Sequence, residues 1–160
     1  MDARLNAYKH APDLMKGLSD LNDKVHAAGL EPALMELVKT RASQINGCAY
    51  CIYTHTREAR AQGETEQRLY MLDAWRESSF YSPRERAALE WTEALTLISQ
   101  GHAPDAVYAQ ARSEFTDQEM VILTLLVTTI NAWNRIAIGF RSQHPIQVSN
   151  SAQRPVERAS

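Results

Sequence analysis

Two cysteines three residues apart, Cys48 and Cys51, and the nearby His55 are the side chains of this sequence most capable of chemistry. On a helical wheel at about 100° per residue, Cys51 lies about 60° and His55 about 20° from Cys48, all on one side. Cys51 and His55 form an i,i+4 pair, whose side chains are neighbours on a helix. An imidazole placed there can take a proton from a thiol or stabilise the thiolate, which is the reactive form. The spacing predicts a redox-active thiol pair.

The residues before the pair predict where its helix begins. Asn46-Gly47 breaks the preceding helix and places both cysteines in the first turn of the next one. Unpaired backbone N–H groups and the helix dipole favour negative charge there, most of all at Cys48. His55 shares a face with both sulfurs, so the sequence does not rank Cys48 against Cys51 as the more reactive thiolate.

Three other interpretations of these residues are weaker. Free cysteine is often buried as a small apolar side chain, which suits either cysteine alone but not the triple. A structural zinc site normally has four ligands, whereas C-x2-C-x3-H offers three and the other histidines are scattered, at His10, His26, His102 and His144. A thioredoxin fold would need the CxxC in a βαβ unit. We therefore expect no metal site.

The composition predicts one soluble domain. The chain has 160 residues, 44% hydrophobic and 22% charged, with a net charge of -2, and no basic patch that would suit a nucleic acid. The N-terminus lacks the apolar run of a signal peptide, and the apolar stretch 120–130 is shorter than the roughly 20 residues of a membrane span. We expect a cytoplasmic protein, where a CxxC is more often redox-active than structural.

Helical periodicity runs through nearly the whole sequence, so the predicted fold class is all-α, with six to seven helices. The expected helices are 14–28, with an apolar face of Leu14, Leu18, Leu21, Val25 and Ala28, then 32–46, 48–62, 65–75, 83–98, 104–112 and 117–136. Ser82-Pro83-Arg84-Glu85 and Thr116-Asp117-Gln118-Glu119 are predicted capping boxes. We expect a domain over 1–147 and a polar, mobile tail over 148–160.

Two features are ambiguous by periodicity alone. The last helix is apolar on more than one side, which favours both a central position in the core and contact with another copy of the chain. Glu36 lies on the wheel opposite Leu34, Val38 and Ile45, which indicates a solvated surface carboxylate.

The stretch from Glu36 to His55 (ELVKTRASQINGCAYCIYTH) closely resembles the core motif of the AhpD-like alkylhydroperoxidases of the carboxymuconolactone decarboxylase superfamily. In that motif a glutamate precedes the first cysteine of CxxC by twelve residues, and a histidine follows the second by four. The likeness continues through Glu58-Ala59-Arg60 and Gly63, and Ile130-Asn131-Ala132-Trp133-Asn134-Arg135 is similar to the closing helix of small members.

The resemblance implies an AhpD-like helical fold, with the CxxC at the N-terminus of a central helix, assembled as a trimer or hexamer. It implies reduction of hydroperoxides, with Cys51 as the attacking thiolate, Cys48 as the resolving thiol and a redox-active disulfide between them. Glu36 and His55 would form a proton relay. No cofactor would be tightly bound, and a lipoyl-bearing protein would reduce the disulfide.

One residue departs from the family pattern and keeps other functions open. Fuller AhpD members have a histidine where this chain has Tyr50, whose hydroxyl is a poor base at neutral pH. A redox-sensing or stress-response oligomer with little turnover therefore remains an alternative to the peroxidase. A lyase of the lactone decarboxylase type is a third, since the superfamily fold provides a cavity, although the decarboxylases lack the cysteine pair.

Overall fold

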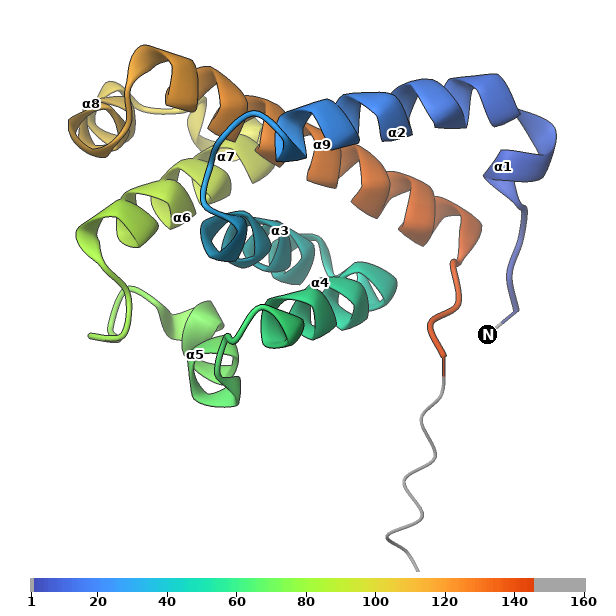
Figure 1. Cartoon of the computed structure of the whole chain (residues 1–160), viewed down its shortest axis with the longest axis horizontal. Helices are drawn as coiled ribbons and strands as arrows, with labels where there is room; N and C mark the ends of the chain where they lie inside the picture. Colours follow the sequence, from blue (N-terminus) through green and yellow to red (C-terminus); the bar gives the residue numbers. More distant parts are fainter. Residues whose placement is uncertain (1, 146–160) are drawn as a thin grey trace, which may run out of the picture.

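The computed structural model describes residues 2–145, and this part of the chain is helical throughout, with no strand. α3 lies in the middle, with α2 and α9 on one side, α4 on another and α6 beside it (Figure 1). The predicted tail 148–160 lies outside the described residues. The elements are α1 (Ala7–His10), α2 (Pro12–His26), α3 (Pro32–Asn46), α4 (Ala49–Ala61), α5 (Glu66–Met71), η1 (Leu72–Ala74), α6 (Pro83–Thr96), α7 (Ile98–Gly101), α8 (Asp105–Glu114) and α9 (Asp117–Phe140).

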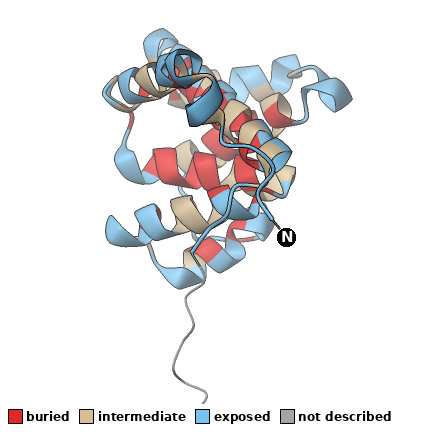
Figure 2. Ribbon diagram, turned by 90° about the vertical axis from the view of Figure 1, so that its right-hand side faces the viewer, coloured by how far each residue is buried: buried red, intermediate tan, exposed pale blue. Residues whose placement is uncertain are grey.

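The core forms where α3, α6 and α9 meet. Val38 of α3 packs in one apolar cluster with Trp91 of α6 and with Leu123 and Leu126 of α9. Buried residues accordingly concentrate on the central helices, while the outer helices expose one side to water (Figure 2). Burial of this surface is the main term that holds α3 in place, and α3 carries Glu36.

Local sequence signals for helix ends are confirmed. Ser82 and Thr116 begin α6 and α9 with complete capping boxes, each closed by the glutamate three residues on, Glu85 and Glu119. Gly47 ends α3 in the left-handed conformation, with φ +67°, which a residue with a Cβ adopts at a cost. The left-handed turn at Gly47 therefore ends α3 and changes the direction of the chain before α4 begins.

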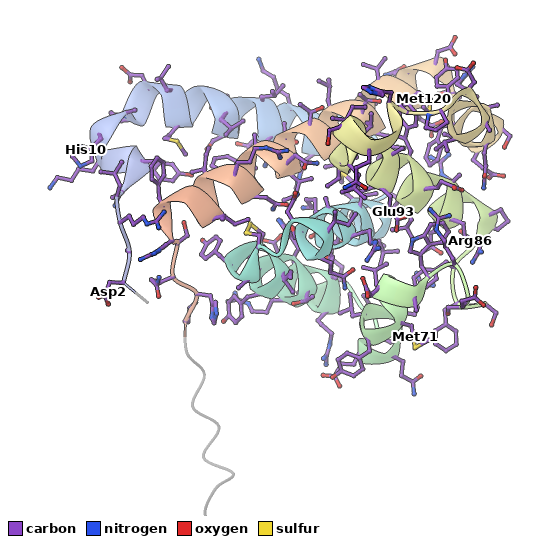
Figure 3. All side chains as sticks on the ribbon, turned by 180° about the vertical axis from the view of Figure 1, so that it is seen from behind. Asp2, His10, Met71, Arg86, Glu93 and Met120 are labelled. Carbon is purple, nitrogen blue, oxygen red and sulfur yellow. A yellow bond between two sulfur atoms is a disulfide. The ribbon has the colours of Figure 1, made fainter. Side chains whose placement is uncertain are left out.

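A carboxylate holds the segment between α4 and α6 against the body of the protein. Glu93 of α6 accepts hydrogen bonds from Trp75 Nε1 at 2.7 Å and Arg41 Nε at 2.8 Å through Oε1, and from Arg76 Nη2 at 2.8 Å through Oε2. Arg86 donates to the carbonyl oxygens of residues 75, 76 and 78. Glu93 and Arg86 thus lie between α6 and this segment (Figure 3).

Some predicted details of the helices are wrong. Leu14 is 78% exposed, because α2 lies on the surface of α9 and turns only a narrow stripe inward, which carries Met15 and Val25. The helix expected over 83–98 ends at Thr96 and is followed by the one-turn α7, so Ile98 is 46% exposed rather than buried. α1, another single turn, was not predicted.

α9 is longer and more continuously apolar than the stretch 120–130 suggested. Its 24 residues would be enough to cross a membrane by length and composition alone. Half of its apolar window is buried inside the protein, however, against α2, α3 and α6. That burial is typical of the core helix of a soluble protein, so α9 is at most weak evidence for a membrane span.

Core packing predicts a clear contrast between two leucines. Leu126→Ala removes a side chain with no exposed surface and should lower the free energy of unfolding by about 2–5 kcal/mol. The matched control Leu14→Ala, at an exposed position, should change it by less than about 0.5 kcal/mol. Denaturant unfolding measures both, and equal losses would contradict the assigned core.

Candidate active site

Cys48 and Cys51 are joined by a disulfide at the start of α4 (Figure 3). Cys48 is the N-cap residue, and its Sγ accepts a hydrogen bond from the backbone N–H of Cys51 at 3.3 Å. Both residues are buried, at 1% and 3% exposed, and they pack with Ala137 of α9. The predicted position of the pair in the first turn is confirmed, with an N–H group directed at sulfur.

A cavity of about 570 Å³ lies beside the disulfide. Cys51 contributes to its wall, whereas Cys48 does not contribute within residues 2–145. The structure thus distinguishes the two thiols that the sequence left unranked: a molecule in the cavity would meet Cys51 first. Tyr50 also lines the cavity and is 39% exposed.

The walls of this cavity divide into an apolar and a polar part. α9 supplies apolar side chains, including Ile130, Trp133 and Phe140, and Leu5 and Tyr8 add to them from the N-terminal part of the chain. The N-terminal segment is tied to the end of α9, because Arg4 N–H donates to the carbonyl oxygen of residue 140 at 2.9 Å. Most of the polar lining comes from α2, α3 and α4, as Asn22, His26, Lys39, Thr54, His55 and Glu58, and Asn6, Ser142 and Gln143 add polar groups from the segments before α1 and after α9.

An amide cluster fixes the turn that carries the cysteines. Asn46, the last residue of α3, donates from Nδ2 to Asn131 Oδ1 at 2.9 Å and to Asn134 Oδ1 at 2.8 Å. Asn134 Nδ2 in turn donates to Ser43 Oγ at 3.1 Å, and Asn134 has no exposed surface. Since buried amides without partners are costly, this cluster holds the end of α3 in register with α9.

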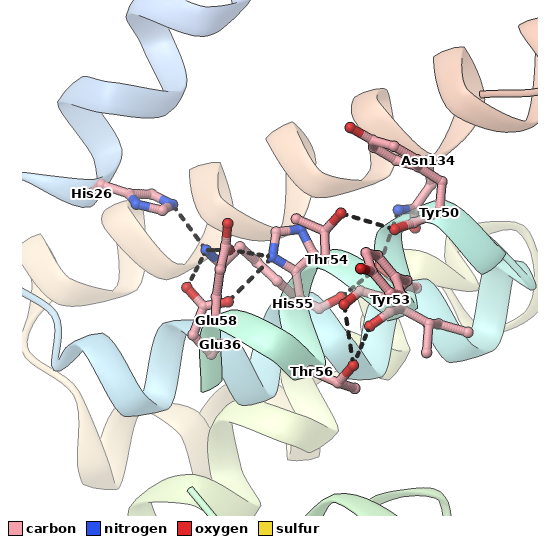
Figure 4. Close-up of polar contacts among 12 residues, drawn as sticks. His26, Glu36, Tyr50, Tyr53, Thr54, His55, Thr56, Glu58 and Asn134 are labelled. Atoms are coloured by element: carbon pink, nitrogen blue, oxygen red, sulfur yellow. Dashed lines mark hydrogen bonds and ion pairs between the residues drawn. The ribbon is translucent and has the colours of Figure 1, made fainter. Parts of the chain in front are cut away.

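Glu36 and His55 lie together, as the family resemblance implied. His55 Nδ1 is 3.2 Å from Glu36 Oε2 and 3.0 Å from Glu58 Oε2 (Figure 4). A nitrogen facing two carboxylates is the one that carries the proton, so Nε2 is left as the proton acceptor. Glu36 is 3% exposed, which overturns the surface position indicated by helical periodicity. α4 covers the face of α3 that the wheel assigned to water.

Burial and hydrogen bonding act on His55 in opposite directions. Desolvation by burial, the largest effect, would lower the pKa of its imidazole, but the hydrogen bonds to Glu36 and Glu58 outweigh it, so the pKa is raised. The pKa of Glu58 is lowered, chiefly by its hydrogen bond to His55. The site therefore holds a histidine that readily accepts a proton.

Two residues of the site were missed at the sequence level. Lys39 Nζ lies 2.5 Å from Glu36 Oε1, 3.2 Å from His26 Nε2 and 3.9 Å from Glu58 Oε2. The spacing of Lys39, three residues after Glu36, was a sequence signal for an ion pair on one helix. His26 comes from α2 and carried no such signal, because only packing brings it to α3 (Figure 4).

Glu36, His55 and Glu58 also satisfy the geometry of a three-ligand metal site, with ligand atoms within 4.8 Å of one another. Lys39 argues against a metal ion here. Its ammonium group lies within 4 Å of both carboxylates and already supplies positive charge to them. A divalent cation in the same space would be repelled by that group.

Comparison with known proteins places the chain in a recognised group. Residues 12–94 match the carboxymuconolactone decarboxylase family. The uncharacterized protein YdfG of Bacillus subtilis is 45% identical over 87% of this chain and 95% of its own length. The crystal structure of ATU0492 from Agrobacterium tumefaciens, a protein of unknown function described as a candidate antioxidant defence protein AhpD, is 43% identical, with a TM-score of 0.89 over 91% of this chain and 100% of its own.

A more distant structure shares only the fold. The debrominase Bmp8 superposes with a TM-score of 0.73 at 19% identity, over 84% of this chain and 73% of its own. Together with ATU0492, it shows that the helical arrangement seen here is AhpD-like.

The two histidines of the polar wall should titrate in opposite directions from the ordinary pKa of about 6.5. The pKa of His55 is raised for the reasons above, whereas burial first, and then the Lys39 ammonium, lower the pKa of His26. NMR titration of the ring protons in the oxidised protein tests this, with signals assigned through His26→Gln and His55→Gln. A higher pKa at His26 than at His55 would contradict the assigned contacts.

Proposed function

The chain belongs to the carboxymuconolactone decarboxylase family, and from this premise we propose that it is a thiol-dependent peroxidase of the AhpD type that reduces organic hydroperoxides. The observation that carries the proposal is that Cys51 and His55 line the same cavity, with the imidazole anchored through Nδ1. The likeness to ATU0492 supports an antioxidant role.

The proposed cycle begins with the reduced pair. The Cys51 thiolate attacks the terminal oxygen of the hydroperoxide, the O–O bond breaks, and the departing alkoxide takes a proton to leave as an alcohol. Cys51 is then a sulfenic acid. The Cys48 thiolate attacks that sulfur and water leaves, which forms the Cys48–Cys51 disulfide. In total, two thiols and one hydroperoxide give one disulfide, one alcohol and one water.

His55 and Glu36 would supply the proton transfers in this cycle. His55 Nε2, with Nδ1–H held by carboxylates, accepts the thiol proton and later returns it to the leaving oxygen. Glu36 stabilises the imidazolium formed in between. A raised pKa at His55 suits this role, because the imidazole binds the thiol proton more tightly and is then available as the acid that protonates the leaving oxygen.

The remaining partners follow from the same proposal. An external dithiol, for which a lipoyl-bearing protein is our candidate, reduces the disulfide, so no tightly bound cofactor is required. We propose a cytoplasmic location as well, because a dithiol that is reduced after each cycle requires a reducing compartment. We further propose a homo-oligomer, a trimer or hexamer, because α9 leaves the apolar side chains of Val121, Leu125 and Ile138 exposed.

The proposed cycle fixes how many thiols each chain should lose to peroxide. Mixing reduced protein with cumene hydroperoxide should consume about two thiols per chain and form an intrachain disulfide. Cys48→Ser should react once and stop as a sulfenic acid, detected by dimedone labelling, while Cys51→Ser should not react at a measurable rate. Wild-type peroxide consumption by Cys51→Ser would rule out the assigned roles, and oxidation without turnover by any dithiol would indicate a redox sensor.

The proposed relay requires both Glu36 and His55. Glu36→Gln and His55→Gln should slow peroxide consumption, with dithiothreitol as donor, by about 10²–10⁴-fold, the usual contribution of a positioned general base. Arg57→Gln, an exposed substitution on the same helix as His55, is the control and should leave the rate unchanged. Rates equal to wild type in both relay variants would exclude the relay.

A further inference from the structure

Lys39 has the largest side chain among those of the described residues that are fully buried. An isolated ammonium group is costly to remove from water, so a buried lysine requires partners that accept its protons. Glu36 Oε1 at 2.5 Å and His26 Nε2 at 3.2 Å are those partners. The peroxidase cycle proposed above assigns no task to either Lys39 or His26.

The two oxygens of the Glu36 carboxylate face different partners. Oε1 accepts from Lys39, and Oε2 lies 3.2 Å from His55 Nδ1 (Figure 4). The carboxylate is therefore held at one oxygen by a fixed charge while its other oxygen faces the histidine of the cavity.

We propose that Lys39 is a positioning residue of the thiol site, which holds the Glu36 carboxylate oriented toward His55. The inference deepens the proposed function, since it concerns the same thiols. Lys39 touches neither sulfur according to the contacts of the described residues, and so it acts through Glu36 rather than on the substrate. His26 completes the arrangement as the neutral acceptor that holds the ammonium from α2.

The charged and titratable groups around Lys39 come from three helices. α2 contributes His26, α3 contributes Glu36, and α4 contributes His55 and Glu58, while α9 turns apolar side chains toward the same cavity. The ammonium group of Lys39 therefore lies near two carboxylates, those of Glu36 and Glu58. If it were removed, His55 would be their neighbour without a lysine beside them.

Without the ammonium, Glu36 Oε1 loses the partner that holds the carboxylate in place, and the carboxylate is free to turn away from His55. An imidazole that loses its carboxylate partner is a weaker base and supports the Cys51 thiolate less. The onset of thiol reactivity should therefore move upward in pH.

The test measures the alkylation rate of Cys51 by iodoacetamide against pH, in a reduced Cys48→Ser background, so that peroxide is not involved. Lys39→Met keeps the length of the side chain and removes the charge. We expect its reactivity midpoint to rise by about one pH unit, with a rate about tenfold lower below the midpoint. In a Glu36→Gln background, Lys39→Met should change the alkylation rate less than about twofold, because the carboxylate through which Lys39 acts is already absent.

Lys16→Met is the matched control. Lys16 also pairs with a carboxylate on its own helix, Asp20 at 2.6 Å, but its side chain is 71% exposed, so the midpoint should not move. Lys39→Gln serves where Lys39→Met fails to fold, because the neutral amide still donates to Glu36; its midpoint should also rise.

Two results would overturn the proposal. One is an unchanged reactivity midpoint in a folded Lys39 variant. The other is a tenfold loss of alkylation rate when Lys39→Met is added to Glu36→Gln. A protein that alkylates as expected but consumes no hydroperoxide would instead refute the peroxidase function alone.

Discussion

Between α3 and α4, the Glu36 carboxylate pairs with both the ammonium group of Lys39 and the imidazole of His55. Lys39 lies at one oxygen and His55 at the other, and neither contact is open to bulk water on the Glu36 side. Because a buried charge is tolerated only when it is paired, these groups depend on each other and on the close packing of the two helices. The proton affinity of the site is consequently a property of the cluster rather than of His55 alone.

The two cysteines differ in their surroundings although they share one turn of helix. Cys48 caps α4, behind the Gly47 turn, and Cys51 lies one turn further on at the cavity wall. Asn46 and its amide partners on α9 hold that turn in place. An attacking thiol needs access to the substrate, while a resolving thiol needs only proximity to its partner, and these surroundings support the roles proposed for Cys51 and Cys48.

α9 serves both the core and the cavity. Its middle packs against α3 and α6 through Leu123 and Leu126, while Trp133 and Phe140, nearer its end, line the cavity with apolar surface. The same helix that stabilises the fold therefore also shapes the space beside Cys51. The organic hydroperoxide proposed as substrate would find both kinds of surroundings there, one for its apolar body and one for its polar O–O group.

The sequence by itself determined what depends on residues close together in the chain. It placed Cys48, Cys51 and His55 on one helix face, located the break at Gly47 and identified the capping boxes, since each is a local pattern of spacing and side-chain type. Periodicity failed for Leu14 and for Glu36, and before the structure only the resemblance to a family indicated a role for Glu36. Whether a helix face meets water or another helix is decided by packing between segments distant in sequence. The tertiary structure alone decided that Glu36 is buried, that Lys39 and His26 complete its surroundings, and that Cys51 rather than Cys48 faces the cavity.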